Sequence, residues 1–200
     1  HNEAVTIAKV AELTTRTELV VALGGDNSVT YATALGAFGT DLETAGLITF
    51  DAHHDIRHGV SNGSPVRRLI EAGLNPQRIL QIGINDFSNS PAYANEAAEL
   101  GIHVIHRDEL ETRALAEVMA EAFGVAGSGG GPIHVDIDVD VCDRAFVPAC
   151  PAAAPGGITA YQLRKLARLA AAHPRVKSID VTEIDATTDS ADGRTVRLGA

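Results

Sequence analysis

Tryptophan is absent from this 200-residue chain, and cysteine occurs only twice, at Cys142 and Cys150. Two thiols in a chain of this length exclude a disulfide framework, so we expect a reducing, cytoplasmic location. Long apolar runs are missing as well: no segment approaches the about 18 uncharged apolar residues of a membrane-spanning helix. The opening residues, HNEAVTIAKV, are neither basic nor followed by an apolar core, so we expect no signal peptide.

Basic residues are also scarce. Lys and Arg number 16 against 26 Asp and Glu, which gives a net charge of −10. This balance argues against nucleic acid or an anionic membrane surface as a partner. Apolar residues, in contrast, make up 45% of the chain, and the mean hydropathy is +0.05. These values are typical of a globular protein that is long enough to bury a sizeable core.

Short apolar runs alternate with segments of helical spacing along the whole chain. The predicted strands lie at 19–23, 47–50, 78–83, 101–105, 133–139 and 176–181, and the predicted helices at 3–13, 28–35, 65–72, 91–100, 109–123 and 159–172. This alternation predicts an α/β fold of three layers, with a mainly parallel sheet between two layers of helices. The glycine-rich segment 124–131 is interpreted as a connector, so we expect one domain over residues 1–200.

The stretch LITFDAHHD, residues 47–55, combines a buried strand with metal-ligand chemistry. Its apolar half is typical of a strand buried on both faces of a parallel sheet. Asp51, His53 and Asp55 follow at alternate positions, so in extended chain their side chains leave the same side. Such a convergence suits a divalent cation, although a solvated polar loop would also explain this motif taken alone.

The same pattern recurs in IHVDIDV, residues 133–139, which places Asp136, Asp138 and Asp140 on one face, with Asp143 after them. Three acids on one face would repel each other strongly, so a bound cation is the favoured interpretation. A glycine pair at 24–25 could instead cradle a phosphate, but it lacks the spacing of the known phosphate loops. All of these polar segments, and Glu183, follow predicted strands, where open α/β sheets bind ligands. The sequence therefore predicts one acidic, metal-filled crevice.

Four motifs taken together resemble those of a known enzyme family. GGDNS, DAHHD, DIDVDVCDRAFVPACPAAAPGG and SIDVTEID are similar, in order and spacing, to motifs of the arginase, agmatinase and formimidoylglutamase family, the ureohydrolases. The resemblance implies an arginase-like fold with a binuclear Mn²⁺ centre at the strand ends. It also implies hydrolysis of a C–N bond in a formimino or guanidino group, and a homo-oligomer, either a trimer or a hexamer.

The resemblance also assigns roles to single residues. It implies that the metal ligands are Asp51, His53, Asp55, Asp138 and Asp140, with Asn27 in the place where the family usually has a histidine. Asn27 then either binds the first of the two ions weakly or merely caps the following helix. Asp143 matches a supporting acid, and Asp143 or Asp55 would orient the nucleophile and relay its proton. Glu183 matches the glutamate that pairs with the cationic group of the substrate.

The choice of substrate rests on smaller similarities. Ser61-Asn62-Gly63-Ser64-Pro65 lacks the histidine that arginases and agmatinases carry there, and it resembles the corresponding formimidoylglutamase loop. We therefore expect hydrolysis of N-formimidoyl-L-glutamate to L-glutamate and formamide. Arg57, Asn62 or Asn85 would bind its carboxylates, with Arg57 favoured, and a structural ion pair is the alternative for Arg57. Urea release by an agmatinase-like or guanidino-acid hydrolase, and a metal-poor non-catalytic relative, remain alternatives. Family chains are typically longer, so we expect that both ends of the family fold are missing here.

Overall fold

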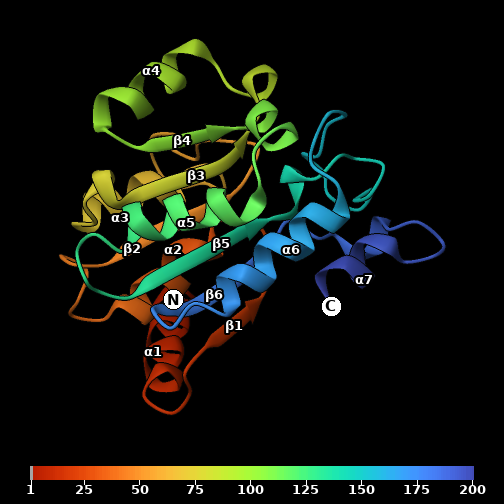
Figure 1. Cartoon of the computed structure of the whole chain (residues 1–200). Helices are drawn as coiled ribbons and strands as arrows, with labels where there is room; N and C mark the ends of the chain where they lie inside the picture. The colour runs from red at the N-terminus through yellow and green to blue at the C-terminus, as the bar shows by residue number, and fades with distance from the viewer. Residues whose placement is uncertain (1) are drawn as a thin grey trace.

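The computed structural model describes residues 2–200 and has one six-stranded parallel sheet between two layers of helices (Figure 1). The sheet order is β1-β6-β5-β2-β3-β4, and every neighbouring pair is parallel. The strands are β1 (Val20–Leu23), β2 (Gly46–Phe50), β3 (Ile79–Ile84), β4 (His103–His106), β5 (Ile133–Asp138) and β6 (Val176–Thr182). The helices are α1 (Asn2–Thr14), α2 (Val29–Phe38), α3 (Pro65–Ala72), α4 (Pro91–Leu100), α5 (Leu115–Ala126), α6 (Ala160–Ala171) and α7 (Arg194–Gly199). The predicted α/β class and sheet direction are confirmed.

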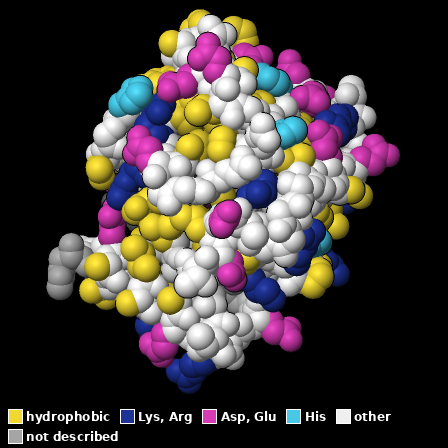
Figure 2. All heavy atoms as spheres, turned by 90° about the vertical axis from the view of Figure 1, so that its left-hand side faces the viewer, with side chains coloured by type: hydrophobic (Ala, Val, Ile, Leu, Met, Phe, Trp, Pro, Cys, Tyr) yellow, Lys and Arg dark blue, Asp and Glu magenta, His cyan; other side chains and the backbone are white. Residues whose placement is uncertain are grey.

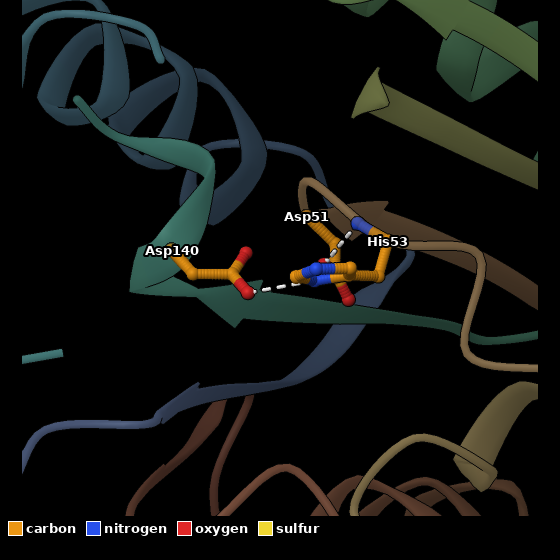
Figure 3. A group of neighbouring side chains, drawn as sticks. All are labelled: Asp51, His53 and Asp140. Carbon is orange, nitrogen blue, oxygen red and sulfur yellow. Dashed lines mark hydrogen bonds and ion pairs between the residues drawn. The ribbon is translucent and has the colours of Figure 1, made fainter. Parts of the chain in front are cut away.

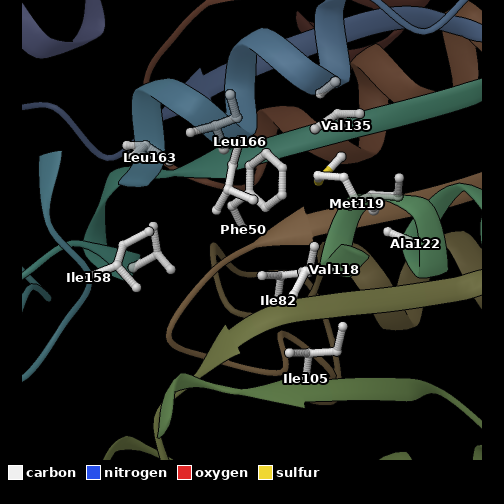
Figure 4. Packing of buried hydrophobic residues seen from close by; sticks show 14 of the residues in the cluster. Phe50, Ile82, Ile105, Val118, Met119, Ala122, Val135, Ile158, Leu163 and Leu166 are labelled. Atoms are coloured by element: carbon white, nitrogen blue, oxygen red, sulfur yellow. The ribbon is translucent and has the colours of Figure 1, made fainter. Parts of the chain in front are cut away.

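Two apolar cores lie on opposite faces of the sheet, because successive strand residues point to opposite sides. On one face, Phe50 and Ile82 pack with residues of α5 and α6, among them Met119 and Leu166 (Figure 4). On the other face, residues of α2, α3 and α4 pack against the sheet around Leu47. All five residues of β2 are buried, as expected for a strand covered on both faces.

The predicted helix over 109–123 is wrong in its first part. Residues Arg107–Glu111 form a 3-10 helix, and α5 begins only at Leu115, after Ala114 has adopted an extended conformation. Leu110 and Leu115 are both buried in the same core although they lie five residues apart. That spacing does not bring two side chains to one helical face, so a break is needed to bury both. Helix α7 is not among the helices predicted from the sequence.

The strand order places the predicted site at the centre of the sheet. From β2 the chain moves outward through β3 to β4, whereas from β5 it moves in the opposite direction to β6. The two directions diverge between β2 and β5, which are direct neighbours in the sheet. A crevice opens at the carboxyl ends of the strands at such a switch point. Asp51 follows β2 and Asp138 ends β5, so both acids lie at this switch point.

The opposite end of the molecule, toward the amino ends of the strands, is different in character. Acidic and basic side chains are interspersed on that face, with hydrophobic side chains between them, and neither sign of charge gathers into a patch (Figure 2). Within residues 2–200, no helix combines the length and the apolar content that crossing a membrane would require.

Candidate metal centre

Three potential ligands from the two central strands meet at the switch point (Figure 3). One ligand atom each of Asp51, His53 and Asp140 lies within 4.8 Å of the other two. The His53 ring nitrogen Nδ1 is 2.8 Å from Asp140 Oδ2 and 3.5 Å from Asp51 Oδ1. Asp140 lies on the 3-10 turn Val139–Val141 rather than on the strand, and this turn aims its carboxylate at the β2 exit.

A small cavity of about 80 Å³ adjoins these ligands. Most of the residues predicted for the site line it, and the full lining is Asn27, His53, Asp55, Arg57, Asn62, Gly63, Asp138, Asp140, Ala152 and Glu183. Asp51 does not line the cavity: it is 1% exposed and contacts His53 beside it. The structure therefore brings the five predicted acid and histidine ligands together, along with Glu183, Arg57 and Asn62.

Burial makes ionisation of the carboxyl groups at this site unfavourable. Burial, followed by repulsion from Asp55, raises the pKa of Asp51 well above its ordinary value, and burial followed by repulsion from Asp140 does the same for Asp138. Burial also raises the pKa of Asp55 to about 7. The hydrogen bond to Asp140 raises the pKa of His53. A divalent cation would supply the missing positive charge, so this oxygen-rich donor set with one imidazole fits a metal such as Mn²⁺.

Two cavity residues have a strained backbone. Asp55 has φ 53° and Glu183 has φ 64°, and they are the only non-glycine residues with positive φ among residues 2–200. Side chains in this left-handed region cost free energy, and such residues cluster at functional sites. Both therefore fit a site in which the direction of the carboxylate matters more than local stability.

Asn27 lies in the cavity, and its contacts contradict the predicted capping role. Its side-chain NH₂ donates to Asp55 Oδ2, and its amide oxygen accepts from the hydroxyls of Thr30 and Thr182 at 2.9 and 3.1 Å. The oxygen that could have bound a metal is thus already occupied and faces away from Asp55. Helix α2 has Ser28, not Asn27, at its N-cap position, and no side-chain capping bond. In this arrangement Asn27 is a hydrogen-bond donor to Asp55, and its predicted part in metal binding stays a prediction.

Glu183 is fixed by the same segment. Its Oε1 accepts from the backbone N–H of Asn27 at 2.8 Å and from Asn62 Nδ2 at 3.3 Å. Asn27 therefore holds Asp55 through its side chain and Glu183 through its backbone. The other carboxylate oxygen of Glu183 has no hydrogen bond among the described residues, so it can accept from a ligand.

Arg57 is free to bind an anion, since it forms no ion pair within residues 2–200. It is exposed and lines the cavity. Its backbone N–H donates to the Gly63 carbonyl at 2.9 Å, and its side chain lies against Gly63. A Cβ at position 63 would come within 2.8 Å of Arg57 Cδ, so the missing side chain makes room for Arg57. The alternative of a structural ion pair is wrong.

Asp143 does not belong to the cavity, and the expectation of a catalytic relay is corrected. Its Oδ1 accepts from the Ala145 N–H at 2.8 Å and its Oδ2 from the Gly156 N–H at 2.7 Å. These two bonds lower the pKa of Asp143 and tie together the two ends of the loop at 145–157. The acids of this motif that line the cavity are Asp138 and Asp140.

The comparison with known proteins agrees with this geometry. The family model described as "Arginase family" matches residues 4–200. The chain belongs to the arginase family.

Relatives within this family fall into more than one activity class. The formimidoylglutamase of Bacillus subtilis is 36% identical over 175 residues, covering 85% of this chain and 54% of that protein. The guanidinopropionase of Pseudomonas aeruginosa is 36% identical over 189 residues, covering 91% and 58%. The chain thus spans little more than half the length of these arginase-family relatives.

Solved structures of the arginase family share the fold. The crystal structure of the Bacillus subtilis formimidoylglutamase has a TM-score of 0.89 at 32% identity, with 98% of this chain and 63% of that chain covered. The Trypanosoma cruzi formiminoglutamase "with Mn2+2" has a TM-score of 0.87, at 21% identity, over 98% and 67%. That second likeness concerns the fold alone.

Two residues of the site were missed by sequence reasoning. Thr30 and Thr182 hold the amide of Asn27, but a threonine in a helix or a strand gives no signal of this in the sequence. One pattern does indicate a contact between Thr30 and Asn27: the two residues lie three positions apart at the start of a predicted helix.

Proposed function

We propose that this chain is the catalytic part of a metal-dependent hydrolase that cleaves N-formimidoyl-L-glutamate to L-glutamate and formamide. Two features of the cavity support this reaction class together. An acidic cluster suited to divalent cations lies at its base, and the unpaired Arg57 lies at its wall. The similarity to enzymes named formimidoylglutamase supports the choice of substrate.

The metal ligands of this proposal are Asp51, His53, Asp55, Asp138 and Asp140, for two Mn²⁺ ions. Such a pair of ions, when bound, supplies Lewis acidity that lowers the pKa of a water molecule toward neutrality. The remaining steps fall to the side chains around the cavity. Asp55 lines the cavity, whereas Asp143 does not, so Asp55 orients the attacking water, receives its proton, and passes that proton to the glutamate nitrogen as its C–N bond breaks.

The substrate is held at its two ends. Glu183 lines the cavity, its Oε1 is held by the Asn27 N–H, and its free oxygen accepts a hydrogen bond from the protonated formimino nitrogen. Arg57 binds a substrate carboxylate, since a guanidinium grips a carboxylate through two parallel bonds. Asn62, which donates to Glu183, lines the same cavity.

A panel of substrates tests the proposal. Formamide and urea release would be measured with Mn²⁺ on N-formimidoyl-L-glutamate, 3-guanidinopropionate, agmatine and L-arginine, with Glu183→Gln as the inactive control. We expect formamide release from the first substrate with the highest kcat/KM. Faster urea release from 3-guanidinopropionate would contradict the proposal and favour a guanidino-acid hydrolase. That second candidate rests on the 36% identity to the guanidinopropionase and on Arg57, which suits either acidic substrate.

Location and assembly are part of the same proposal. We propose a cytoplasmic enzyme, because Cys142 and Cys150 are both free and buried. Burial raises the pKa of the Cys142 thiol to about 12, so neither metal binding nor nucleophilic attack is expected of it. A homo-oligomer, trimer or hexamer, is proposed from the family resemblance.

A further inference from the structure

The amide of Asn27 has a defined orientation because its two ends meet different partners. The NH₂ end faces Asp55, and its Nδ2 donates to Asp55 Oδ2. The carbonyl end then lies between two hydroxyls, 2.9 Å from Thr30 Oγ1 and 3.1 Å from Thr182 Oγ1. Asn27, Thr30 and Thr182 are 2%, 0% and 1% exposed, so solvent cannot replace either hydroxyl.

Each hydroxyl carries one proton, and in both cases the nearest acceptor is Asn27. The competing acceptor for Thr30 is Asp136 Oδ1 at 3.3 Å, and for Thr182 it is the carbonyl of Ile137 at 3.5 Å. Both alternatives are longer than the bond to Asn27. Two donors from separate elements, helix α2 and strand β6, thus converge on one amide oxygen.

We propose that Thr30 and Thr182 are positioning residues that hold the Asn27 amide with its NH₂ group against Asp55. This inference rests on the proposed metal centre, in which Asp55 is a ligand. The bond from Asn27 fixes the direction of the Asp55 carboxylate, and ligating carboxylates depend on such outer hydrogen bonds for metal affinity. Without the hydroxyls, the amide can turn over and place its oxygen against the carboxylate, which repels the ligand from its metal-binding position.

Thr30→Val and Thr182→Val remove one hydroxyl each while keeping the branched shape of the side chain. We expect the dissociation constant for Mn²⁺, measured by electron paramagnetic resonance of the free ion, to rise about two- to tenfold in each variant. Thr30→Ser retains the hydroxyl and should restore the affinity. Because Thr182 lies on another element, its variants test the idea even if Thr30→Val does not fold.

Thr33→Val is the matched control. Thr33 lies one turn further along α2, is 1% exposed, and donates to Asp180 instead of Asn27. Its loss should lower the melting temperature as Thr30→Val does, but leave the Mn²⁺ dissociation constant unchanged. In an Asn27→Ala background, Thr30→Val should not change the Mn²⁺ affinity further, because Thr30 acts on the metal site only through Asn27.

The outcomes separate this inference from the proposed function. If the unmodified chain binds no Mn²⁺, the proposed metal centre fails, and this inference fails with it. If the chain binds Mn²⁺ but Thr30→Val and Thr182→Val bind it as tightly, only the positioning role is overturned. An equal loss of affinity in Thr33→Val, or a full effect of Thr30→Val without Asn27, would likewise overturn it.

Discussion

Removing the metal should make the stability of this protein fall as the pH rises from 5 to 7.5. The reason is that the cavity acids are costly to ionise in the folded chain. A carboxyl group whose pKa is higher in the folded than in the unfolded state binds more protons when folded. Its stabilising contribution is present at low pH and is lost as the pH rises between the two pKa values. His53, whose pKa is also raised, acts in the same direction.

Asp55 alone gives the size of the effect. Its pKa rises from an ordinary value of 3.8 to about 7, so most of its titration in the folded chain falls inside this pH range. Integrating the linkage between pH 5 and 7.5 gives about 2–3 kcal/mol of lost stability. For a domain of this size, that corresponds to roughly 5–10 °C in melting temperature. Asp51 and Asp138 add to the fall, because their pKa values shift in the same direction.

Differential scanning fluorimetry of chelator-treated protein, in buffers of equal ionic strength, measures this slope. Acids with lowered pKa values, such as Glu3 and Asp143, lose their contribution only near pH 4 and below, outside the range. Burial lowers the pKa values of His54 and His173, so these two groups oppose the fall within the range, and comparison with Asp55→Asn isolates the part due to Asp55. Asp55→Asn should flatten the slope, and added Mn²⁺ should stabilise the protein more at pH 7.5 than at pH 5. An equal slope in Asp55→Asn and in the unmodified metal-free protein would refute the reasoning.

Three substitutions test other parts of the site. Asp138→Asn should abolish Mn²⁺ binding and turnover, because a ligand is lost. The same change should raise the melting temperature of the metal-free protein at pH 7.5, because it removes a negative charge that repels its neighbours. Retained Mn²⁺ binding would show that Asp138 is not a ligand. Arg57→Ala should raise KM about ten- to a hundredfold for an acidic substrate and far less for agmatine, and an equal effect on both would contradict carboxylate binding. Gly63→Ala, whose Cβ would come within 2.8 Å of Arg57 Cδ, should raise KM in the same direction but less, with the fold intact. Unchanged kinetics in Gly63→Ala would mean that the position of Arg57 against Gly63 has no role.

Much of the fold could be predicted because the apolar runs that indicate strands are followed directly by the acids that indicate metal ligands. The apolar run before Asp51 and the one before Asp138 each predicted a strand, and both strands are present. Parallel strands end at one edge of a sheet, so acids that follow them must lie near each other. The sequence did not predict the order of the strands, which depends on which helix packs on which face.

The predictions that differ from the structure share a cause: a local sequence pattern does not predict contacts between distant segments. Asp143 follows the acidic motif directly, yet its partners are backbone amides, one of them 13 residues further on. Asn27 matched a ligand position, but hydroxyls from α2 and β6 determine which of its atoms faces the cavity. The break before α5 likewise depends on burying Leu110 and Leu115 together.

The metal content of the purified chain tests the central claim most directly. Protein stripped with a chelator would be dialysed against Mn²⁺ at pH 7.5, passed over a desalting column, and analysed by elemental mass spectrometry, with Asp51→Asn as the control. The account predicts bound Mn²⁺ approaching two ions per chain, and none in Asp51→Asn. A chain that retains no Mn²⁺, or that retains as much in Asp51→Asn as in the unmodified protein, would contradict it.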